Sequence, residues 1–369
     1  MNVLVTDGIM KKSLSVVRSI APLTTDLGVT SSYRRSMAGV SRYTDRHHHI
    51  DQDDPAAYVT EIGGVLDRYG YEYVLPVGGW TTNILSEYRS ELSSAVEVVL
   101  PNRESMRTAQ QKLATYRLGE SLDIPVPKTV RATPETDLGS VREFGFPVVV
   151  KAPTESAPRF IEYADSIAEL RTAVRTYRHR YGDDPLVQEY ICGEGCGFFA
   201  LYLDGDCIGC YTHERIREYP PSGGISACAV SKADEQLTEM GTLILDTLKW
   251  NGPAMIEFKR DDHGVPNLIE INPKFWGSLD LGIASGFDFP TAILQYLNRG
   301  TYPTFEFHPR RYHWPLSGDL QHAVSRPQAA PDVVSDLLSS ETSSNLSLSD
   351  PLPHVLELTK AVLSPFVGE

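Results

Sequence analysis

Two acidic side chains interrupt a pair of apolar segments in the second half of the chain. Glu257 lies in the run 254–260, and Glu270 lies in the run 265–271, with Asn272 directly after it. The Asp-Asp-His-Gly sequence between the runs predicts a turn joining two antiparallel strands, which would place the two glutamates near one another. Asn272 lies two residues beyond Glu270, so it would point to the same face. Two carboxylates and a carboxamide on one face suit Mg²⁺, which prefers oxygen ligands.

A solvated sheet face is the alternative explanation for these acidic residues. It accounts for Glu257 and Glu270 taken one at a time, but it accounts less well for the apolar residues that surround them. Acids that intrude into apolar strands are usually paired or coordinated, because burying an unpaired charge is costly. We therefore predict that Glu257, Glu270 and Asn272 form a metal site.

The run from Glu270 to Trp276, taken with Glu257, resembles the magnesium-binding end of the ATP-grasp superfamily. That superfamily includes D-alanine–D-alanine ligase, biotin carboxylase and carbamoyl phosphate synthetase. More narrowly, the chain is similar to predicted ATP-dependent carboligases of the carboxylate-amine ligase kind. The similarity spans roughly residues 101–300. It implies a chain of the α/β and α+β classes, in which a Rossmann-like domain precedes a two-lobed ATP-grasp domain.

The resemblance assigns two lysines to the phosphates of ATP. In the family one lysine from a helical segment and one from a strand contact the nucleotide, and Lys112 and Lys151 match these positions. Lys151 also ends the apolar run 148–151, where a lysine needs a partner that a phosphate can supply. The alternatives are a strand-end lysine that extends its ammonium into solvent for Lys151, and an exposed helix lysine for Lys112.

Residues 187–191 resemble the hinge between the two ATP-grasp lobes. The resemblance implies that backbone groups around Glu189, Tyr190 and Ile191 hydrogen-bond the adenine edge. Glu194, just beyond, is the candidate for the ribose hydroxyls, with an exposed loop acid as the alternative.

The loop that covers the phosphates is usually rich in glycine in this family, so that backbone N–H groups can approach phosphate. The corresponding residues here, 153–158, contain no glycine. We expect Ser156 and its neighbouring amides to cap a phosphate instead.

Arg215 and Arg217 alternate along a predicted strand, which would aim two cations at one anion. In the family such arginines meet the transferred phosphoryl group or the acyl phosphate, whereas a solvated strand face is the alternative. Lys274 and Ser278 resemble positions that meet the γ-phosphate or the acceptor. We expect His213 to be a packed strand residue.

The first hundred residues alternate strand and helix signals, which predicts a mostly parallel sheet. No Gly-x-Gly-x-x-Gly follows the first strand, so we predict no dinucleotide site there. Trp80 follows a Gly-Gly turn after a predicted strand and either contacts the acceptor or packs. The expected division is residues 1–100 for an α/β domain before ATP-grasp, 101–191 for the first ATP-grasp part with its small lobe, 192–300 for the second lobe with the magnesium-binding strands, and 301–369 for a C-terminal extension that is partly loop.

Several local patterns add expectations about individual elements. The spacing predicts one helix from Glu104 to Leu122 and a strand from Val96 to Leu100. Residues 339–350, rich in Ser and Thr, are expected to be a loop or linker. Three consecutive histidines, His47 to His49, are expected in a loop and not at a metal, because neighbouring residues do not converge on one ion.

The five cysteines do not predict a metal site, although four of them form a Cys-x3-Cys and a Cys-x2-Cys pair. Residues 196–211 read as a hairpin turning near Gly205, so Cys207 would pair near Leu203 and Cys196 near Glu214. The two cysteine pairs would then lie roughly 23 Å apart at ~3.3 Å per residue. A tetrahedral zinc site needs all four sulfurs within ~2.3 Å of the ion. Five cysteines without a secretion signal favour reduced thiols.

The net charge of −14 argues against partners that present phosphate backbones or anionic membrane surfaces. No apolar run is long enough to span a bilayer, and the first ten residues do not read as a signal peptide. We expect a cytoplasmic protein with no nucleic-acid or membrane partner; a homodimer stays open.

The resemblance implies a carbon–nitrogen ligase that uses ATP with Mg²⁺ or Mn²⁺ and releases ADP, and the residues described above are consistent with it. It would activate a small-molecule carboxylate as an acyl phosphate for attack by an amine. Two alternatives stay open from the sequence. One is a small-molecule kinase built on the same fold, and the other is an ATP-binding module without catalysis. The sequence names neither substrate.

Overall fold

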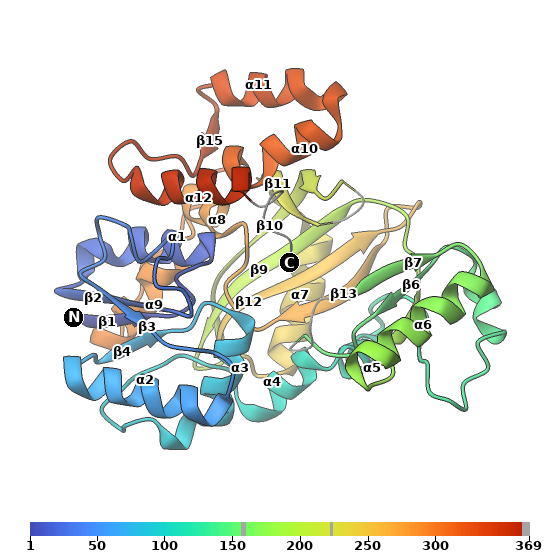
Figure 1. Cartoon of the computed structure of the whole chain (residues 1–369), viewed down its shortest axis with the longest axis horizontal. Helices are drawn as coiled ribbons and strands as arrows, with labels where there is room; N and C mark the ends of the chain where they lie inside the picture. Colours follow the sequence, from blue (N-terminus) through green and yellow to red (C-terminus); the bar gives the residue numbers. More distant parts are fainter. Residues whose placement is uncertain (156–159, 222–223, 364–369) are drawn as a thin grey trace.

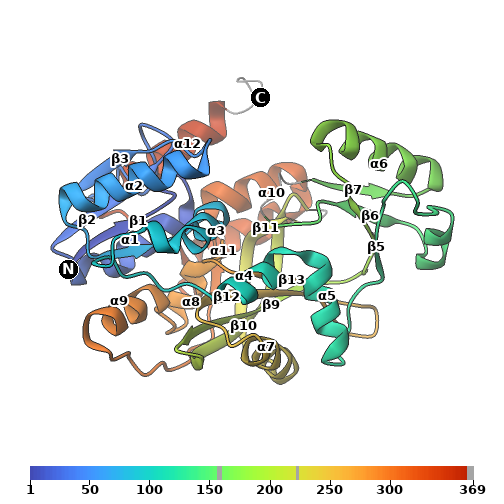
Figure 2. The same ribbon diagram turned by 90° about the horizontal axis from the view of Figure 1, so that it is seen from below.

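The computed structural model describes residues 1–155, 160–221 and 224–363, and within them the strands form three sheets (Figure 1). A four-stranded parallel sheet holds the N-terminal region. A seven-stranded sheet forms the centre, and a four-stranded antiparallel sheet forms a separate small lobe. Figure 2 shows the small lobe at one end of the molecule and the N-terminal sheet at the other. The part of the chain described here contains no helix long and apolar enough to cross a membrane.

The N-terminal sheet has the strand order β3-β2-β1-β4, with every neighbouring pair parallel. Its strands are β1 (Asn2–Val5), β2 (Asp26–Ser31), β3 (Arg46–His49) and β4 (Tyr73–Leu75), and its helices are α1 (Lys11–Ile20), η1 (Ala21–Leu23), α2 (Pro55–Tyr69), α3 (Gly79–Glu87) and η2 (Arg89–Glu91). Helix α2 begins where Asp54 accepts a hydrogen bond from the Ala57 amide, and it ends at Gly70 in the left-handed conformation. The predicted parallel sheet is confirmed.

Two expectations for this region were wrong. The histidine triplet is strand β3, because His47 to His49 pair with β2 in parallel register. The predicted strand from Val96 to Leu100 is reduced to one bridge between Glu97 and Tyr73. Both outcomes depend on whether a neighbouring strand is in reach, which the local sequence does not specify.

The single helix expected from Glu104 to Leu122 is two helices, α4 (Arg103–Gln110) and α5 (Lys112–Ser121). Gln111 between them is extended, with φ −95° and ψ 103°, and it forms a bridge with Thr154. The break therefore comes from tertiary pairing and places Lys112 at the start of the second helix.

The small lobe is an antiparallel sheet in the order β5-β8-β6-β7, covered by one long helix. Its elements are β5 (Thr129–Arg131), η3 (Ser140–Phe144), β6 (Val148–Lys151), β7 (Ile161–Ala164), α6 (Ile167–Tyr181) and β8 (Leu186–Glu189). Apolar side chains of α6, including Leu170, Val174 and Tyr177, pack on Val148 and Val150 of β6. This core holds β6, and with it Lys151, in place.

The central sheet runs in the order β13-β12-β9-β10-β11-β14-β15. Its elements are β9 (Gly195–Leu203), β10 (Asp206–Tyr219), β11 (Ile225–Lys232), α7 (Glu235–Thr247), β12 (Gly252–Arg260), β13 (Pro266–Asn272), α8 (Leu279–Ala284), α9 (Phe289–Arg299), β14 (Arg311–His313) and β15 (Thr342–Ser344). Phe198 and Ile256 pack with α7 on one face. Phe199 and Met255 lie in a second core with α9 and the N-terminal sheet, on the other face.

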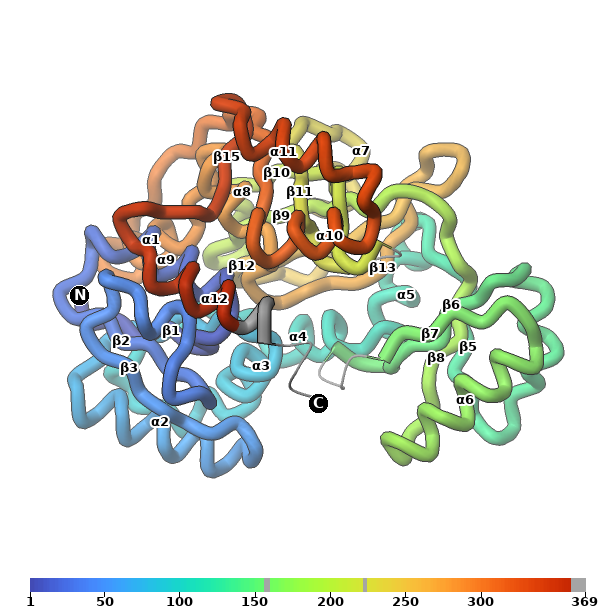
Figure 3. Tube along the Cα trace, turned by 45° about the horizontal axis from the view of Figure 1, so that its top comes forward, coloured from blue at the N-terminus to red at the C-terminus, as the bar shows by residue number. Residues whose placement is uncertain are grey.

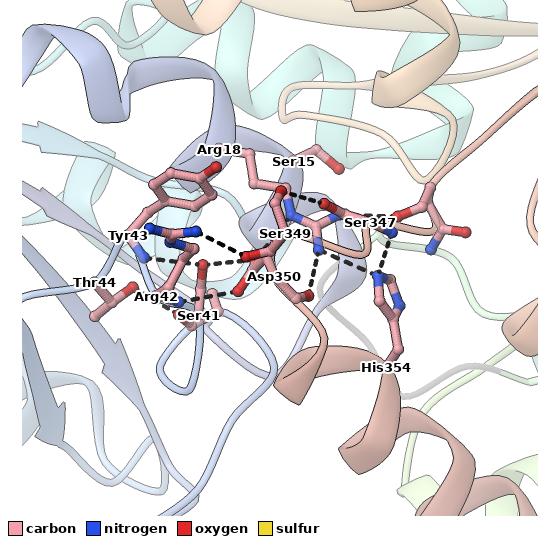
Figure 4. Close-up of polar contacts among 12 residues, drawn as sticks. Ser15, Arg18, Ser41, Arg42, Tyr43, Thr44, Ser347, Ser349, Asp350 and His354 are labelled. Atoms are coloured by element: carbon pink, nitrogen blue, oxygen red, sulfur yellow. Dashed lines mark hydrogen bonds and ion pairs between the residues drawn. The ribbon is translucent and has the colours of Figure 1, made fainter.

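The C-terminal segment joins the central sheet and then returns to the N-terminal region (Figure 3). Its helices are η4 (Pro315–Asp319), α10 (Leu320–Ser325), η5 (Pro327–Ala329), α11 (Ala330–Leu338) and α12 (Leu352–Leu363). Residues 339–350 are not simply a linker, because they contain β15 and the buried Asp350. Asp350 accepts hydrogen bonds from Arg18 of α1, the Ser41 hydroxyl and the Arg42 amide, as Figure 4 shows.

Candidate active site

The two predicted metal-ligand glutamates face each other across neighbouring strands. Glu257 of β12 pairs in register with Glu270 of β13, and Asn272 pairs with Met255, so all three ligand candidates share one face. The side-chain amide of Asn272 donates a hydrogen bond to Glu270 Oε1 over 2.8 Å. The predicted register of these two strands is confirmed.

Burial and charge act on the two carboxylates in opposite directions. Burial raises the pKa of Glu257 above its ordinary value, even though the Arg215 guanidinium lies 2.9 Å from its Oε1. Burial also opposes ionisation of Glu270, but Lys112 and the Asn272 amide outweigh it and hold the pKa of Glu270 below its ordinary range. The facing carboxylates repel each other, which a bound cation would relieve.

The chemistry of this donor set fits Mg²⁺. Two carboxylates and one carboxamide leave most of an octahedral shell to phosphate oxygens and water, which is the usual arrangement for this ion. No cluster of three or more His, Cys, Asp or Glu side chains able to hold a metal occurs among the described residues. A closed all-protein cage is thus absent from that part of the chain, and Glu257, Glu270 and Asn272 are suited to a metal that arrives with a phosphate ligand.

Lys112 lies beside the predicted metal ligands and is buried. Its ammonium is 3.1 Å from Glu270 Oε2, and it also forms an ion pair with Glu155. The Lys112 amide donates to the Pro153 carbonyl over 3.1 Å, and the Glu155 amide donates to the Gln110 carbonyl over 3.0 Å. These bonds bring the start of the predicted phosphate loop onto the α4–α5 junction. The rest of that loop, including Ser156, lies outside the described residues.

Lys151 ends β6 with its side chain buried, as the sequence predicted. Its ammonium donates to the Tyr116 hydroxyl over 2.7 Å, and that hydroxyl donates to the Ile269 carbonyl over 2.9 Å. Burial lowers the pKa of Lys151 to about 8, while Glu270 and Glu257 act to raise it. Lys112 and Lys151 therefore approach the same acidic pair from two different elements.

The expectation that Arg215 and Arg217 point to one anion was wrong. A bulge lies between them, so Arg215 pairs in register with Ala229 and Arg217 with Cys228. Ala229 and Cys228 are consecutive, and consecutive strand residues point to opposite faces. Arg215 accordingly meets Glu257, whereas Arg217 is enclosed elsewhere.

Arg217 belongs to a buried ion-pair network on the other side of the sheet. Its guanidinium makes two hydrogen bonds of 2.8 Å to Asp319 and lies 2.7 Å from Asp336. His313 contacts Asp319 at 2.9 Å, and Arg311 contacts Asp336 at 2.7 Å. We therefore withdraw Arg217 from the catalytic candidates and assign it to anchoring the C-terminal segment.

The hinge candidates lie at the end of β8, whose last residue is Glu189. The Glu189 amide donates to the Lys128 carbonyl over 2.9 Å, so this N–H is already used. Among the residues described, Tyr190 and Ile191 have no backbone–backbone hydrogen bond. The Tyr190 ring lies 4.3 Å from the ammonium of Lys259. Of the three candidates, Tyr190 and Ile191 have backbone groups left for an adenine edge.

Glu194 is exposed beside the turn between β12 and β13. Its carbonyl accepts from the Arg260 amide over 3.0 Å, while its side chain stays in solvent.

The last site candidates follow Asn272. The Lys274 ammonium lies 3.8 Å from the Glu155 carboxylate. It is also 3.1 Å from the position that a Cβ would occupy on Gly79, so the two residues are in contact. The Ser278 hydroxyl lies 3.4 Å from His213 Nδ1. His213 is buried and packs against the Phe199 ring with a centroid separation of 4.4 Å, as expected of a packed strand residue.

Comparisons with known proteins agree with this arrangement. Residues 185–313 match the model of a family described as ATP-grasp in the biosynthetic pathway with Ter operon. Biotin carboxylase from Campylobacter jejuni, solved as a β,γ-ATP complex, superposes with a TM-score of 0.68 at 15% identity, over 84% of this chain and 74% of that chain. The chain has the ATP-grasp fold. Its predicted combination of an α/β N-terminal region with a two-lobed ATP-grasp fold is confirmed.

Two further solved structures are similar to this chain. N5-carboxyaminoimidazole ribonucleotide synthetase from Thermotoga maritima superposes with a TM-score of 0.63 at 18% identity, over 84% of this chain and 80% of that chain. The L-amino acid ligase from Bacillus licheniformis gives a TM-score of 0.60 at 14% identity, over 81% of this chain and 74% of that chain. At these identities the likeness establishes the fold.

Sequence reasoning missed Tyr116 of the ATP-grasp chain. It lies on α5 one helical turn after Lys112, and its hydroxyl orients Lys151. The spacing of four residues, which puts both side chains on one helix face, was the available signal. Trp80, for which acceptor contact and packing were both expected as alternatives, packs edge-on against Tyr58 with ring centroids 5.0 Å apart.

We expect Tyr116→Phe to lower the free energy of unfolding by about 1–3 kcal/mol, because the buried Lys151 ammonium loses its hydroxyl partner. Urea denaturation followed by circular dichroism would measure the change. Tyr69→Phe, on the N-terminal α2, provides a matched control. A Tyr116→Phe protein as stable as the parent would contradict this role for the hydroxyl.

The cysteine hairpin has nearly the predicted register. Cys196 pairs with Glu214, and Cys207 pairs with Tyr202, one residue from the expected Leu203. A bulge after Cys207 accounts for the shift. All five cysteines are free thiols.

Proposed function

We propose that this protein is an ATP- and Mg²⁺-dependent ligase that activates a small-molecule carboxylate as an acyl phosphate for attack by an amine. One observation carries the proposal. Glu257, Glu270 and Asn272 share a face, and Lys112 pairs with that group from a separate element. The fold similarity to ATP-dependent ligases supports it.

In the proposed site Glu257, Glu270 and Asn272 hold Mg²⁺ or Mn²⁺, which would supply charge neutralisation at the phosphates. Lys112 and Lys151 hold the phosphate oxygens by charge-assisted hydrogen bonds. Because these groups are fixed by buried partners, they act chiefly by positioning and by electrostatic stabilisation. Backbone groups of Tyr190 and Ile191 hydrogen-bond the adenine edge, and Glu194 is retained for the ribose.

The proposed reaction has two steps that the remaining residues assist. A carboxylate oxygen attacks the γ-phosphorus while the bond to the ADP oxygen breaks. The amine nitrogen then attacks the acyl carbon, inorganic phosphate leaves, and the nitrogen loses a proton. Arg215 would stabilise the negative charge on the transferring group, and Lys274 would contact the substrate beside it. We retain the division at residues 100, 191 and 300 as part of this proposal.

The test is a screen for ADP release. Purified protein would be incubated with Mg-ATP and with pools of small carboxylic acids and amines, and the products analysed by mass spectrometry. A joined acid–amine product with ADP and phosphate supports the ligase. A phosphomonoester would instead show a kinase, and Mg-ATP binding without ADP from any pool would show a binding module.

A further inference from the structure

A lysine from the N-terminal region also reaches the proposed site. Lys12 lies on α1 and is 9% exposed, and its ammonium donates to the Phe275 carbonyl over 2.6 Å. Phe275 directly follows Lys274 in the chain, and the positive charges of Lys12 and Lys274 act on each other. Gly79, at the start of α3, adjoins the Lys274 ammonium. Three elements thus bring two cations together where the N-terminal sheet meets the loop after β13.

The charge of Lys12 is not balanced by a nearby carboxylate. An ammonium has three donors, and the Phe275 carbonyl takes one. Within residues 1–155, 160–221 and 224–363, no acidic group lies within 4.0 Å of its nitrogen. Burial and the Lys274 charge lower the pKa of Lys12 to about 7, and Asp7 only partly offsets them. The Asp7 carboxylate is already bonded to Thr81 and to the Gly78 amide.

The position of Lys12 adds to this imbalance. It stands in the first turn of α1, where the helix dipole is positive and favours anions over cations. No acidic residue occupies that turn. A buried ammonium at a helix N-terminus and beside a second ammonium is unfavourable unless an anion joins them.

We propose that Lys12 and Lys274 bind a carboxylate that the substrate keeps throughout the reaction. This inference rests on the proposed function and names its substrate class: an acid or amine that carries a further free carboxylate, such as a dicarboxylic acid or an amino acid. The reacting group lies toward Arg215 and the predicted metal ligands, and the retained carboxylate lies between the two lysines. The N-terminal region therefore selects the substrate, while the central sheet holds ATP.

Calorimetry on the full chain tests the proposal, with and without a non-hydrolysable Mg-ATP analogue. The probes are matched pairs that differ by one charge: glutarate with glutaramate, succinate with succinamate, and L-alanine with L-alaninamide. We expect at least one carboxylate probe to bind about tenfold or more tightly than its amide partner. A preference for glutarate or succinate alone would show that the acid substrate carries the retained carboxylate. A preference for L-alanine alone would show that the amine acceptor carries it.

Variants separate recognition from structure. Lys12→Met should remove the preference for the carboxylate probe, and Lys12→Arg should restore it. If Lys12→Met is unstable, Lys12→Gln replaces it in the test, because glutamine keeps a donor for the Phe275 carbonyl but carries no charge. Lys12→Gln should also lose the preference for the carboxylate probe. Lys11→Met is the matched control, because the neighbouring Lys11 is directed at the Trp314 ring, 4.6 Å away.

Two results would overturn the proposal: no carboxylate probe binding the parent protein, or equal binding by the parent and both uncharged variants. Binding of the Mg-ATP analogue by itself is read in the same titrations. A failure of the analogue to bind would count against the proposed function and not against the anion subsite. Binding of the analogue without binding of any carboxylate probe would count against the subsite alone.

Discussion

Replacing Glu270 and Asn272 together by alanine should reduce ADP formation at least about 100-fold while leaving a folded protein. The double variant removes two of three proposed metal ligands and the carboxylate that pairs with Lys112. Stability should change little, because the substitution also removes the repulsion between Glu270 and Glu257. ADP release with the best substrates of the screen, Mg-ATP calorimetry and thermal unfolding would measure these effects.

The control for this variant is Glu239→Ala, which removes an exposed acid from α7, on the opposite face of the central sheet. It should match the parent in all three measurements. Full ADP formation by the Glu270→Ala, Asn272→Ala protein would rule out the metal site proposed here.

Asp319→Ala should lower the free energy of unfolding by about 3–5 kcal/mol, the largest stability effect that we expect. Asp319 is fully buried, makes two hydrogen bonds to Arg217 and contacts His313. Its loss leaves a buried guanidinium that retains only the Asp336 side of the network. Equilibrium denaturation in urea, with circular dichroism as the readout, would measure the change.

The same variant tests the reassignment of Arg217. Under conditions where Asp319→Ala is fully folded, its ADP formation per molecule should equal that of the parent, because the network lies on the other face from Glu257. Asp332→Ala removes an exposed acid from α11 and serves as the control for stability. A drop in turnover without a drop in stability would return Arg217 to the catalytic candidates.

The sequence alone predicts those parts of the candidate site in which local spacing decides the geometry. Glu257, Glu270 and Asn272 lie on two strands joined by a tight turn, so their register follows from the turn and from the alternation of side chains. Lys151 ends an apolar run, and its burial follows from that run.

Long-range contacts decided the positions of other site residues, which the spacing in the sequence does not specify. The bulge after Arg215 reverses the face of Arg217, and it coincides with a C-terminal network whose partners lie a hundred residues away. The helix break at Gln111 depends on a bridge to Thr154. Tyr116 bonds to Lys151 and to the Ile269 carbonyl because α5 packs beside β6 and β13.

By itself, the sequence indicated the kind of chemistry that we propose for the centre of this protein: oxygen ligands for a magnesium ion, with lysines for phosphate. The three ligand candidates lie on two strands joined by a tight turn, and Lys151 ends an apolar run, so short-range geometry places these four residues. Only the tertiary structure brought Lys12 to Lys274, because α1 and the loop after β13 are more than two hundred residues apart. Their proximity depends on how the N-terminal sheet packs on the central sheet, which no local pattern encodes.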